Sequence, residues 1–193
     1  MFIDTETLPF LKNIANSSND IYEELVSVLS KEPEAHKAIH GEMVMDFPSN
    51  QWAWESGINR ERVGYDLRDG NFSMYAIYKK TGNEVTLDRT SLFPKTMSLL
   101  SSFDNPHYIA FNFLHPGSHL KPHSHIRKHY VYHLLLQNLT DGNCEMICGK
   151  ERKYLKAAGD HLMFDYSQIH ETFHRASNVR INLMVDFLPE SRL

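Results

Sequence analysis

From Gly70 onward the sequence is a succession of short β-prone segments separated by turns. The segments that we expect to form strands are 72–78, 108–114, 120–125, 130–137, 144–148, 153–156, 161–165, 171–175 and 179–188. Lys79–Glu84 (KKTGNE) is typical of a turn, and Asp141-Gly142 predicts a hairpin turn. Many short strands with turns between them favour an all-β sandwich or barrel. We therefore predict a jelly roll over residues 70–190, within one domain that spans residues 1–193.

The first 69 residues predict a helical adaptor region packed on the outside of that jelly roll. A helix is expected from about Ile21 to Lys31, because apolar residues recur there with helical spacing. Asn19 or Asp20 is the expected N-cap, with Glu23 in a capping-box position. A second helical turn is expected over 34–40, and a further short helix over 95–102.

Charge and hydropathy exclude several classes of partner. The net charge of −4 provides no basic surface for nucleic acid or for an anionic membrane. No apolar run approaches the ~20 residues that span a bilayer, and the N-terminus lacks the features of a signal peptide. We therefore expect a cytoplasmic protein without a nucleic-acid or membrane partner.

Histidines gather in one part of the chain and predict a metal site. Of the 12 histidines, seven lie between His107 and His133. On a strand, His123 and His125 project from the same face, about 6.6 Å apart along the chain. His170, on a distant segment, is the candidate partner, with His174 as the alternative; the two lie about 13 Å apart on a strand, so one metal cannot take both. Two or three imidazoles with open positions suit iron(II).

Arg180 is the second unusual residue, because it opens an otherwise apolar strand, RINLMVDF. Alternation places Arg180, Asn182, Met184 and Asp186 on one face of that strand, and Ile181, Leu183, Val185 and Phe187 on the other. A guanidinium that points into a barrel needs an anion, since an unpaired buried charge is costly. Its planar fork matches a carboxylate, either on a co-substrate or in an internal salt bridge with Asp165 or Asp186.

Five sequence stretches occur in a fixed order that carries a family resemblance. They are FPKTMSLL (93–100), FLHPGSHLKPH (113–123), HLLL (133–136), GDHLMFDYSQIHE (159–171) and RINLMVDF (180–187). In this ordered combination, the residues from about 70 to 190 resemble the aspartyl/asparaginyl β-hydroxylases, which are iron(II)- and 2-oxoglutarate-dependent oxygenases on a double-stranded β-helix. The N-terminal part shows no visible match to that family.

The resemblance implies a role for each matching residue. His123 and His170 are the implied iron ligands, which favours His170 over His174. Arg180, ten residues after His170, is implied to bind the distal carboxylate of 2-oxoglutarate. His133 is implied to contact the co-substrate, and Asn112 to assist it.

This chain departs from the family at two positions near the site. His125 stands two residues after the first ligand, where the family often has Gly and relatives have Asp. The centre is therefore expected to hold either three histidines, or two histidines and water with His125 in the substrate pocket. Members that act on aspartyl side chains carry arginines just before the HLxL histidine, whereas this chain has Val131 two residues before His133.

The substrate pocket has three further candidate residues. Trp52 and Trp54 lie at i, i+2, so on a strand they face the same way. Packing against the main sheet is their favoured interpretation, and lining the pocket is the alternative. Phe72, at the start of the first β-prone segment, is the third candidate.

The function that follows is hydroxylation of an unactivated C–H bond in an amino-acid, peptide or other small-molecule substrate. The alternative enzyme is a three-histidine cupin, a dioxygenase or isomerase without 2-oxoglutarate, because His123, His125 and His170 also imitate cupin spacing. A non-catalytic metal-binding barrel is the third hypothesis. Arg180 separates the first two, since only the oxygenase requires it.

Overall fold

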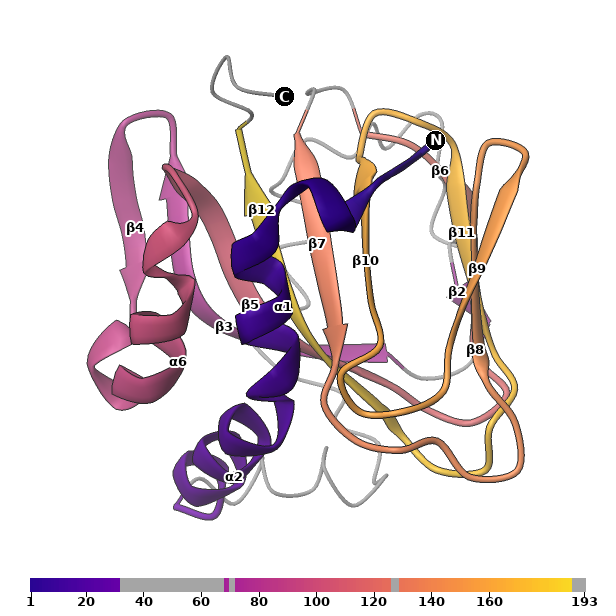
Figure 1. Ribbon diagram of the computed structural model, residues 1–193, viewed down its shortest axis with the longest axis horizontal. Coiled ribbons are helices and arrows are strands. Elements are labelled where there is room, and N and C mark those ends of the chain that lie inside the picture. Colours follow the sequence, from indigo (N-terminus) through magenta and orange to yellow (C-terminus); the bar gives the residue numbers. More distant parts are fainter. Residues whose placement is uncertain (32–67, 70–71, 126–128, 189–193) are drawn as a thin grey trace.

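The computed structural model describes residues 1–31, 68–69, 72–125 and 129–188, and it contains two antiparallel sheets (Figure 1). In hydrogen-bonding order, the seven-stranded sheet consists of β1 (Phe2–Ile3), β10 (His161–Asp165), β7 (Tyr130–Leu135), β12 (Arg180–Phe187), β5 (Pro106–Leu114), β3 (Phe72–Thr81) and β4 (Glu84–Asp88). The five-stranded sheet consists of β2 (Arg68–Asp69), β6 (His119–His123), β11 (His170–His174), β8 (Cys144–Cys148) and β9 (Glu151–Leu155). This architecture confirms the predicted all-β, cupin-like double-stranded β-helix.

Among the described residues, three helices cover the outer face of the seven-stranded sheet, and two of them come from the N-terminal region, as predicted (Figure 1). They are α1 (Pro9–Asn16), α2 (Ser18–Leu29) and α6 (Pro94–Leu99), with 3-10 turns at Thr5–Thr7, Thr90–Leu92 and Leu100–Ser102. Among the described helices, none has the length and apolar character needed to span a bilayer.

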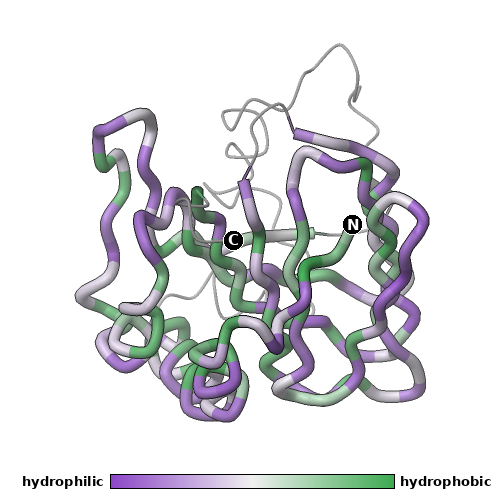
Figure 2. The backbone as a smooth tube through the Cα atoms, turned by 45° about the horizontal axis from the view of Figure 1, so that its top comes forward, coloured by the Kyte–Doolittle hydropathy of each residue, from purple (hydrophilic) through white to green (hydrophobic). Residues whose placement is uncertain are grey.

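Strand β12 is buried on both faces because it lies between the helices and the barrel interior. Ile181 and Leu183 join the apolar cluster under the helices, whereas Met184 joins the cluster between the two sheets. The predicted alternation along this strand is therefore confirmed. In Figure 2, hydrophilic residues mark the tip of the β3–β4 hairpin, while apolar residues gather where the helices meet the sheet.

The N-terminal helices differ from the prediction in extent. Helix α2 begins at Ser18, three residues earlier than expected, and the predicted caps are wrong, since its N-cap Ser17 makes no side-chain capping bond. The Nδ2 of Asn19 donates instead to the Glu23 side chain at 3.2 Å. Helix α1 was not predicted; Pro9 at its first turn starts it without losing a hydrogen bond.

The turns also differ from the prediction. The turn expected over 79–84 is shorter in the structure and contains Gly82 at φ 62°. Strand β3 therefore extends to Thr81, and an unpredicted strand, β4, begins at Glu84. Asp141-Gly142 is not a hairpin turn: it connects β7 in one sheet to β8 in the other. A Cβ at Gly142 would collide with the carbonyl of Arg175, so this loop, not a hairpin, requires the glycine.

The N-terminal region also contributes to the barrel itself. Strand β1 pairs with β10, with Phe2 opposite Phe164, so the larger sheet starts at the second residue. The helical turn predicted over 34–40 and the paired residues Trp52 and Trp54 lie outside the described residues.

The carboxylate of Glu24, on α2, joins helix α6 to helix α2 by hydrogen bonds. The side chain of Glu24 accepts hydrogen bonds from the backbone N–H groups of Lys95 and Thr96, both at 2.8 Å, and from the Thr96 hydroxyl at 2.7 Å. Glu24 thus satisfies two amides that the first turn of α6 leaves without helical partners.

We predict that Glu24→Ala lowers the free energy of unfolding by about 1–3 kcal/mol, because those amides lose their acceptor. Chemical denaturation of the two proteins measures the change. Glu23→Ala, which removes an exposed carboxylate one residue away, is the matched control and should cost less than about 0.5 kcal/mol. Equal losses in both variants would contradict this role for Glu24.

Candidate metal centre

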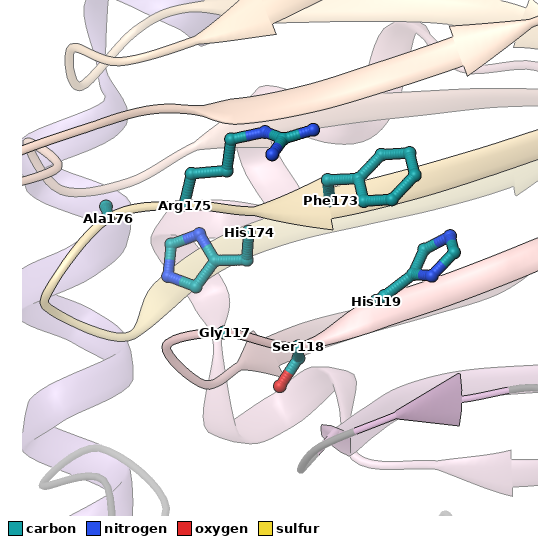
Figure 3. Close-up of a pocket in the computed structure, with 7 residues that line it drawn as sticks. All are labelled: Gly117, Ser118, His119, Phe173, His174, Arg175 and Ala176. Carbon is teal, nitrogen blue, oxygen red and sulfur yellow. The ribbon is translucent and has the colours of Figure 1, made fainter.

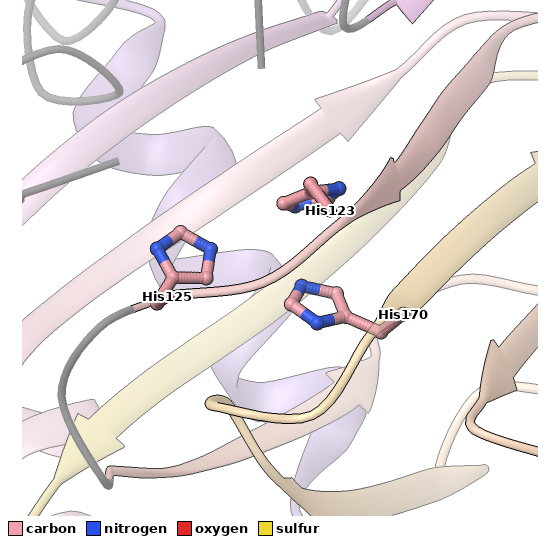
Figure 4. Close-up of side chains that lie close together, drawn as sticks. All are labelled: His123, His125 and His170. Carbon is pink, nitrogen blue, oxygen red and sulfur yellow. The ribbon is translucent and has the colours of Figure 1, made fainter. Parts of the chain in front are cut away.

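Three histidine side chains converge inside the barrel (Figure 4). His123 ends β6 and lies directly opposite His170, the first residue of β11. His125 lies two residues beyond the end of β6, where its backbone N–H donates to the Tyr166 carbonyl at 3.2 Å. One ring nitrogen from each of the three histidines lies within 4.8 Å of the other two. The structure therefore brings together all three residues that the sequence nominated for a metal.

Backbone carbonyls fix the orientation of two of these rings. The Nδ1 of His123 lies 2.6 Å from the Lys121 carbonyl oxygen, and the Nδ1 of His170 lies 2.8 Å from that of Gln168. A carbonyl oxygen only accepts hydrogen bonds, so each Nδ1 carries the proton and each Nε2 keeps its lone pair. This is the arrangement in which an imidazole binds a metal through Nε2.

Burial keeps the three rings neutral. Desolvation lowers the pKa of His123, and together with the nearby His123 it lowers the pKa of His170 to about 3. Desolvation, followed by repulsion from His170 and His123, lowers the pKa of His125 to about 2. Neutral imidazole is the form that binds metal, so the cluster is ready for a cation at neutral pH.

His125 differs from the other two because neither of its ring nitrogens has a hydrogen-bond partner among the described residues. Its ring stacks on Tyr166, with the centroids 3.5 Å apart. A buried polar atom without a partner is costly. The unpaired nitrogens of His125 and the lone pairs of His123 and His170 therefore fit a metal ion.

An aromatic wall shields the cluster. The rings of Phe164 and Tyr166 lie 4.9 Å and 5.0 Å from that of His170. Burial, with the nearby Asp186 carboxylate, raises the pKa of Tyr166 above its usual value, so this phenol stays neutral. Such apolar rings lower the local dielectric beside His170, which strengthens electrostatic interactions there.

Arg180 lies on the inner face of β12 and is only 1% exposed. Its Nη1 donates to the Cys144 thiol at 3.2 Å, and its Nε has no hydrogen-bond partner among the described residues. The internal salt bridge considered for it is not formed in this part of the chain: Asp165 accepts from Ser167, and Asp186 pairs with His129. A buried cation beside a weak thiol acceptor is suited to an incoming anion.

The other predicted co-substrate residues share this interior. His133 lies on the inner face of β7, stacked on Phe164 with 5.9 Å between the centroids. Burial, and then the charge of Arg180, hold the pKa of His133 well below its usual range. Asn112 lies on the inner face of β5, where its Nδ2 donates to Met184 Sδ at 3.4 Å and its Oδ1 is unpaired.

The predicted substrate-pocket residues are only partly described. Phe72 is half-buried at the start of β3 and packs against the apolar cluster between the sheets. Trp52 and Trp54 lie outside the described residues, so their proposed role in a pocket stays a prediction.

Sequence reasoning missed two functional candidates in the interior. His129 and Asp186 form a buried pair, with Nδ1 2.6 Å from Oδ1, and the His107 ring lies 5.1 Å from that of His129. Asn182 is fully buried with both side-chain polar atoms unpaired. The available signal was the alternation in the 180–187 strand, which placed Asn182 and Asp186 on the same face as Arg180.

His174 does not belong to the cluster. Its Nε2 lies 2.6 Å from the Asn178 carbonyl oxygen. Burial is the main reason that the pKa of His174 is lowered to about 4. It lines a separate cavity of about 270 Å³ whose lining contains none of the three clustered histidines (Figure 3). The other residues that line it are Gly117, Ser118, His119, Phe173, Arg175 and Ala176.

The fold and the cluster together define a cupin-like barrel with a histidine-lined interior site. The chain belongs to the aspartyl/asparaginyl β-hydroxylase family, whose family model matches residues 16–189. The resemblance seen in the sequence is confirmed, and the match also covers most of the N-terminal region, where none was visible. The family description makes the chain a hydroxylase by class.

Solved structures with a similar fold are distant in sequence. A predicted oxalate decarboxylase from Thermotoga maritima is 16% identical with a TM-score of 0.43, over 63% of this chain and 84% of that chain. A cupin superfamily protein from Desulfitobacterium hafniense is 12% identical with a TM-score of 0.38, over 63% of this chain and 81% of that one. A comparison with curated proteins gave no match.

Proposed function

We propose that this protein is an iron(II)- and 2-oxoglutarate-dependent hydroxylase that acts on an amino-acid, peptide or other small-molecule substrate. His123 and His170 hold the metal through Nε2, while Arg180 binds the distal carboxylate of 2-oxoglutarate. When bound, iron(II) and 2-oxoglutarate supply the oxidising chemistry that an unactivated C–H bond requires.

The observation that carries this proposal is the buried Arg180 guanidinium, which has no carboxylate partner in the described part of the chain. A cation in that position destabilises the fold unless an anion reaches it. A metal-dependent barrel that does not use 2-oxoglutarate has no need for such a charge. A dicarboxylate with one end at the metal and the other at Arg180 supplies the missing partner.

The remaining interior residues orient the reactants and keep water out. His133 lies on the inner face of β7, stacked on Phe164, and we expect it to contact the co-substrate. Its unpaired Nδ1 and the unpaired Oδ1 of Asn112 are available for that contact. Phe164 and Tyr166 exclude water on the side of His170.

The direct test is anaerobic titration of the purified protein with iron(II) and 2-oxoglutarate, in which we expect a metal-to-ligand charge-transfer band. Admission of oxygen should then convert 2-oxoglutarate to succinate. Iron binding without either signal would refute 2-oxoglutarate dependence, and would leave the cupin or a non-catalytic metal-binding barrel.

A three-histidine cupin dioxygenase is the second candidate, and the position of His125 favours it. A ring nitrogen of His125 lies within 4.8 Å of the ligand nitrogens of His123 and His170. Three neutral imidazoles on one ion would leave fewer open positions for a chelating co-substrate.

We predict that His125→Gly still binds iron and still converts 2-oxoglutarate, with hydroxylation uncoupled from that conversion. The physical reason is that, within the cluster, His123 and His170 have rings aligned by backbone carbonyls, whereas the His125 ring is held by stacking on Tyr166. Metal analysis and succinate assays check this result. A folded His125→Gly protein without iron would establish a three-histidine centre.

A further inference from the structure

Asn182 is a buried amide that the fold does not use. Its side chain is 0% exposed, and neither its Oδ1 nor its Nδ2 has a hydrogen-bond partner among the described residues. It lies on the inner face of β12, between Arg180 and Met184, and is in register with Asn112 on one side and Leu135 on the other.

An unpaired buried amide lowers stability, because both of its polar atoms lose their hydrogen bonds to water on folding. A hydrogen-bonded asparagine does not carry that cost. Asn178, for example, accepts from the Thr140 N–H at 2.8 Å and donates to the Asn138 carbonyl at 2.9 Å. Leucine has the same branched shape as asparagine, so at position 182 it would place methyl groups beside Leu135 and leave no polar side-chain atom unpaired.

The surroundings of Asn182 indicate what it binds. Two residues earlier on the same inner face is Arg180, whose Nε is also unpaired. A carboxylate has about four lone-pair sites, and a guanidinium fork uses two of them. An amide N–H beside the fork can donate to a third without adding charge.

We propose that Asn182 binds the far carboxylate of the co-substrate together with Arg180, donating a hydrogen bond from Nδ2. This inference rests on the proposed 2-oxoglutarate dependence. In this proposal, Arg180 and Asn182 together bind the far carboxylate. Recognition of the dicarboxylate then depends on a neutral hydrogen-bond donor as well as on a positive charge.

The test combines stability with ligand selectivity. We expect Asn182→Leu to raise the unfolding midpoint of the metal-free protein by about 2–6 °C, because an unpaired amide is removed. With Mn(II) bound in place of iron, calorimetry should show roughly tenfold or more weaker binding of 2-oxoglutarate. The affinity for 2-oxopentanoate, which has a methyl group in place of the far carboxylate, should not change.

Two further variants keep the outcome decisive. Asn178→Leu, the same substitution at a hydrogen-bonded asparagine, should lower the unfolding midpoint and leave 2-oxoglutarate affinity unchanged. Asn182→Ala, which removes the amide without adding volume or charge, should also weaken 2-oxoglutarate binding and leave the affinity for 2-oxopentanoate unchanged. It answers the question if the leucine variant does not fold.

Different results separate this inference from the proposed function. If Arg180→Ala loses 2-oxoglutarate affinity while Asn182→Leu keeps it, Asn182 has only a water or a structural contact, and the inference is overturned while the hydroxylase stands. Failure of the unaltered protein to bind 2-oxoglutarate would overturn both.

Discussion

His123→Ala and His170→Ala are each expected to abolish iron(II) binding, whereas His174→Ala is expected to leave it intact. The first two histidines lie opposite each other on β6 and β11, with their rings 4.2 Å apart and each Nε2 available. Removal of either one leaves too few protein ligands to compete with water. His174 is committed through Nε2 to the Asn178 carbonyl and lies outside the three-histidine cluster.

Metal analysis after anaerobic reconstitution measures this difference. His174→Ala is the matched control, because it removes a buried histidine from the same strand and the same face as His170. Circular dichroism and the unfolding midpoint establish that each variant is folded. Full iron occupancy in folded His170→Ala would show that the metal binds elsewhere.

Arg180→Ala is expected to retain iron but to weaken 2-oxoglutarate binding by roughly 30- to 150-fold. A charge-assisted bidentate contact contributes about 2–3 kcal/mol, and here the guanidinium is 1% exposed, so solvent does not screen it. The metal-free protein should not lose stability in proportion, because the buried charge has no ionic partner among the described residues.

Arg152→Ala provides the matched control for Arg180. Arg152 pairs with Glu145 at 2.6 Å, but its side chain is 60% exposed. Its removal should leave 2-oxoglutarate affinity unchanged. Titration of the charge-transfer band compares the variants, and an Arg180→Ala protein with unaltered affinity would favour the cupin interpretation.

Most strands, and the candidate site residues on them, were predictable because they depend on local sequence patterns. Strands β8 (Cys144–Cys148) and β10 (His161–Asp165) were predicted with their observed bounds, and the alternation in 180–187 located the inward face of β12. That period-2 pattern follows from pleating alone. The same local reasoning singled out His123 and Arg180 and left His170 and His174 as alternatives, between which the family resemblance favoured His170.

What could not be predicted depends on contacts between distant segments. Asp141-Gly142 has the sequence of a hairpin turn, but its loop bonds to the segment after β11, through Ser177 N–H to Thr140 O at 2.8 Å. The pairing of His129 with Asp186 joins residues 57 positions apart. Local propensity carries no information about such partners, so tertiary packing decided both.

The carbonyl contacts of the two metal-site histidines also affect how the site tolerates mutation. Because Lys121 and Gln168 hold His123 and His170 through main-chain atoms, their own side chains can change without loss of that support. If a side-chain carboxylate accepted these hydrogen bonds instead, a single substitution would remove the support. Pro122 strengthens this arrangement, since the residue before a proline is restricted to extended backbone, which limits where the Lys121 carbonyl can point. Substitution of Lys121 should therefore leave the orientation of the His123 ring unchanged. Replacement of Pro122 would instead free the Lys121 backbone to adopt other conformations.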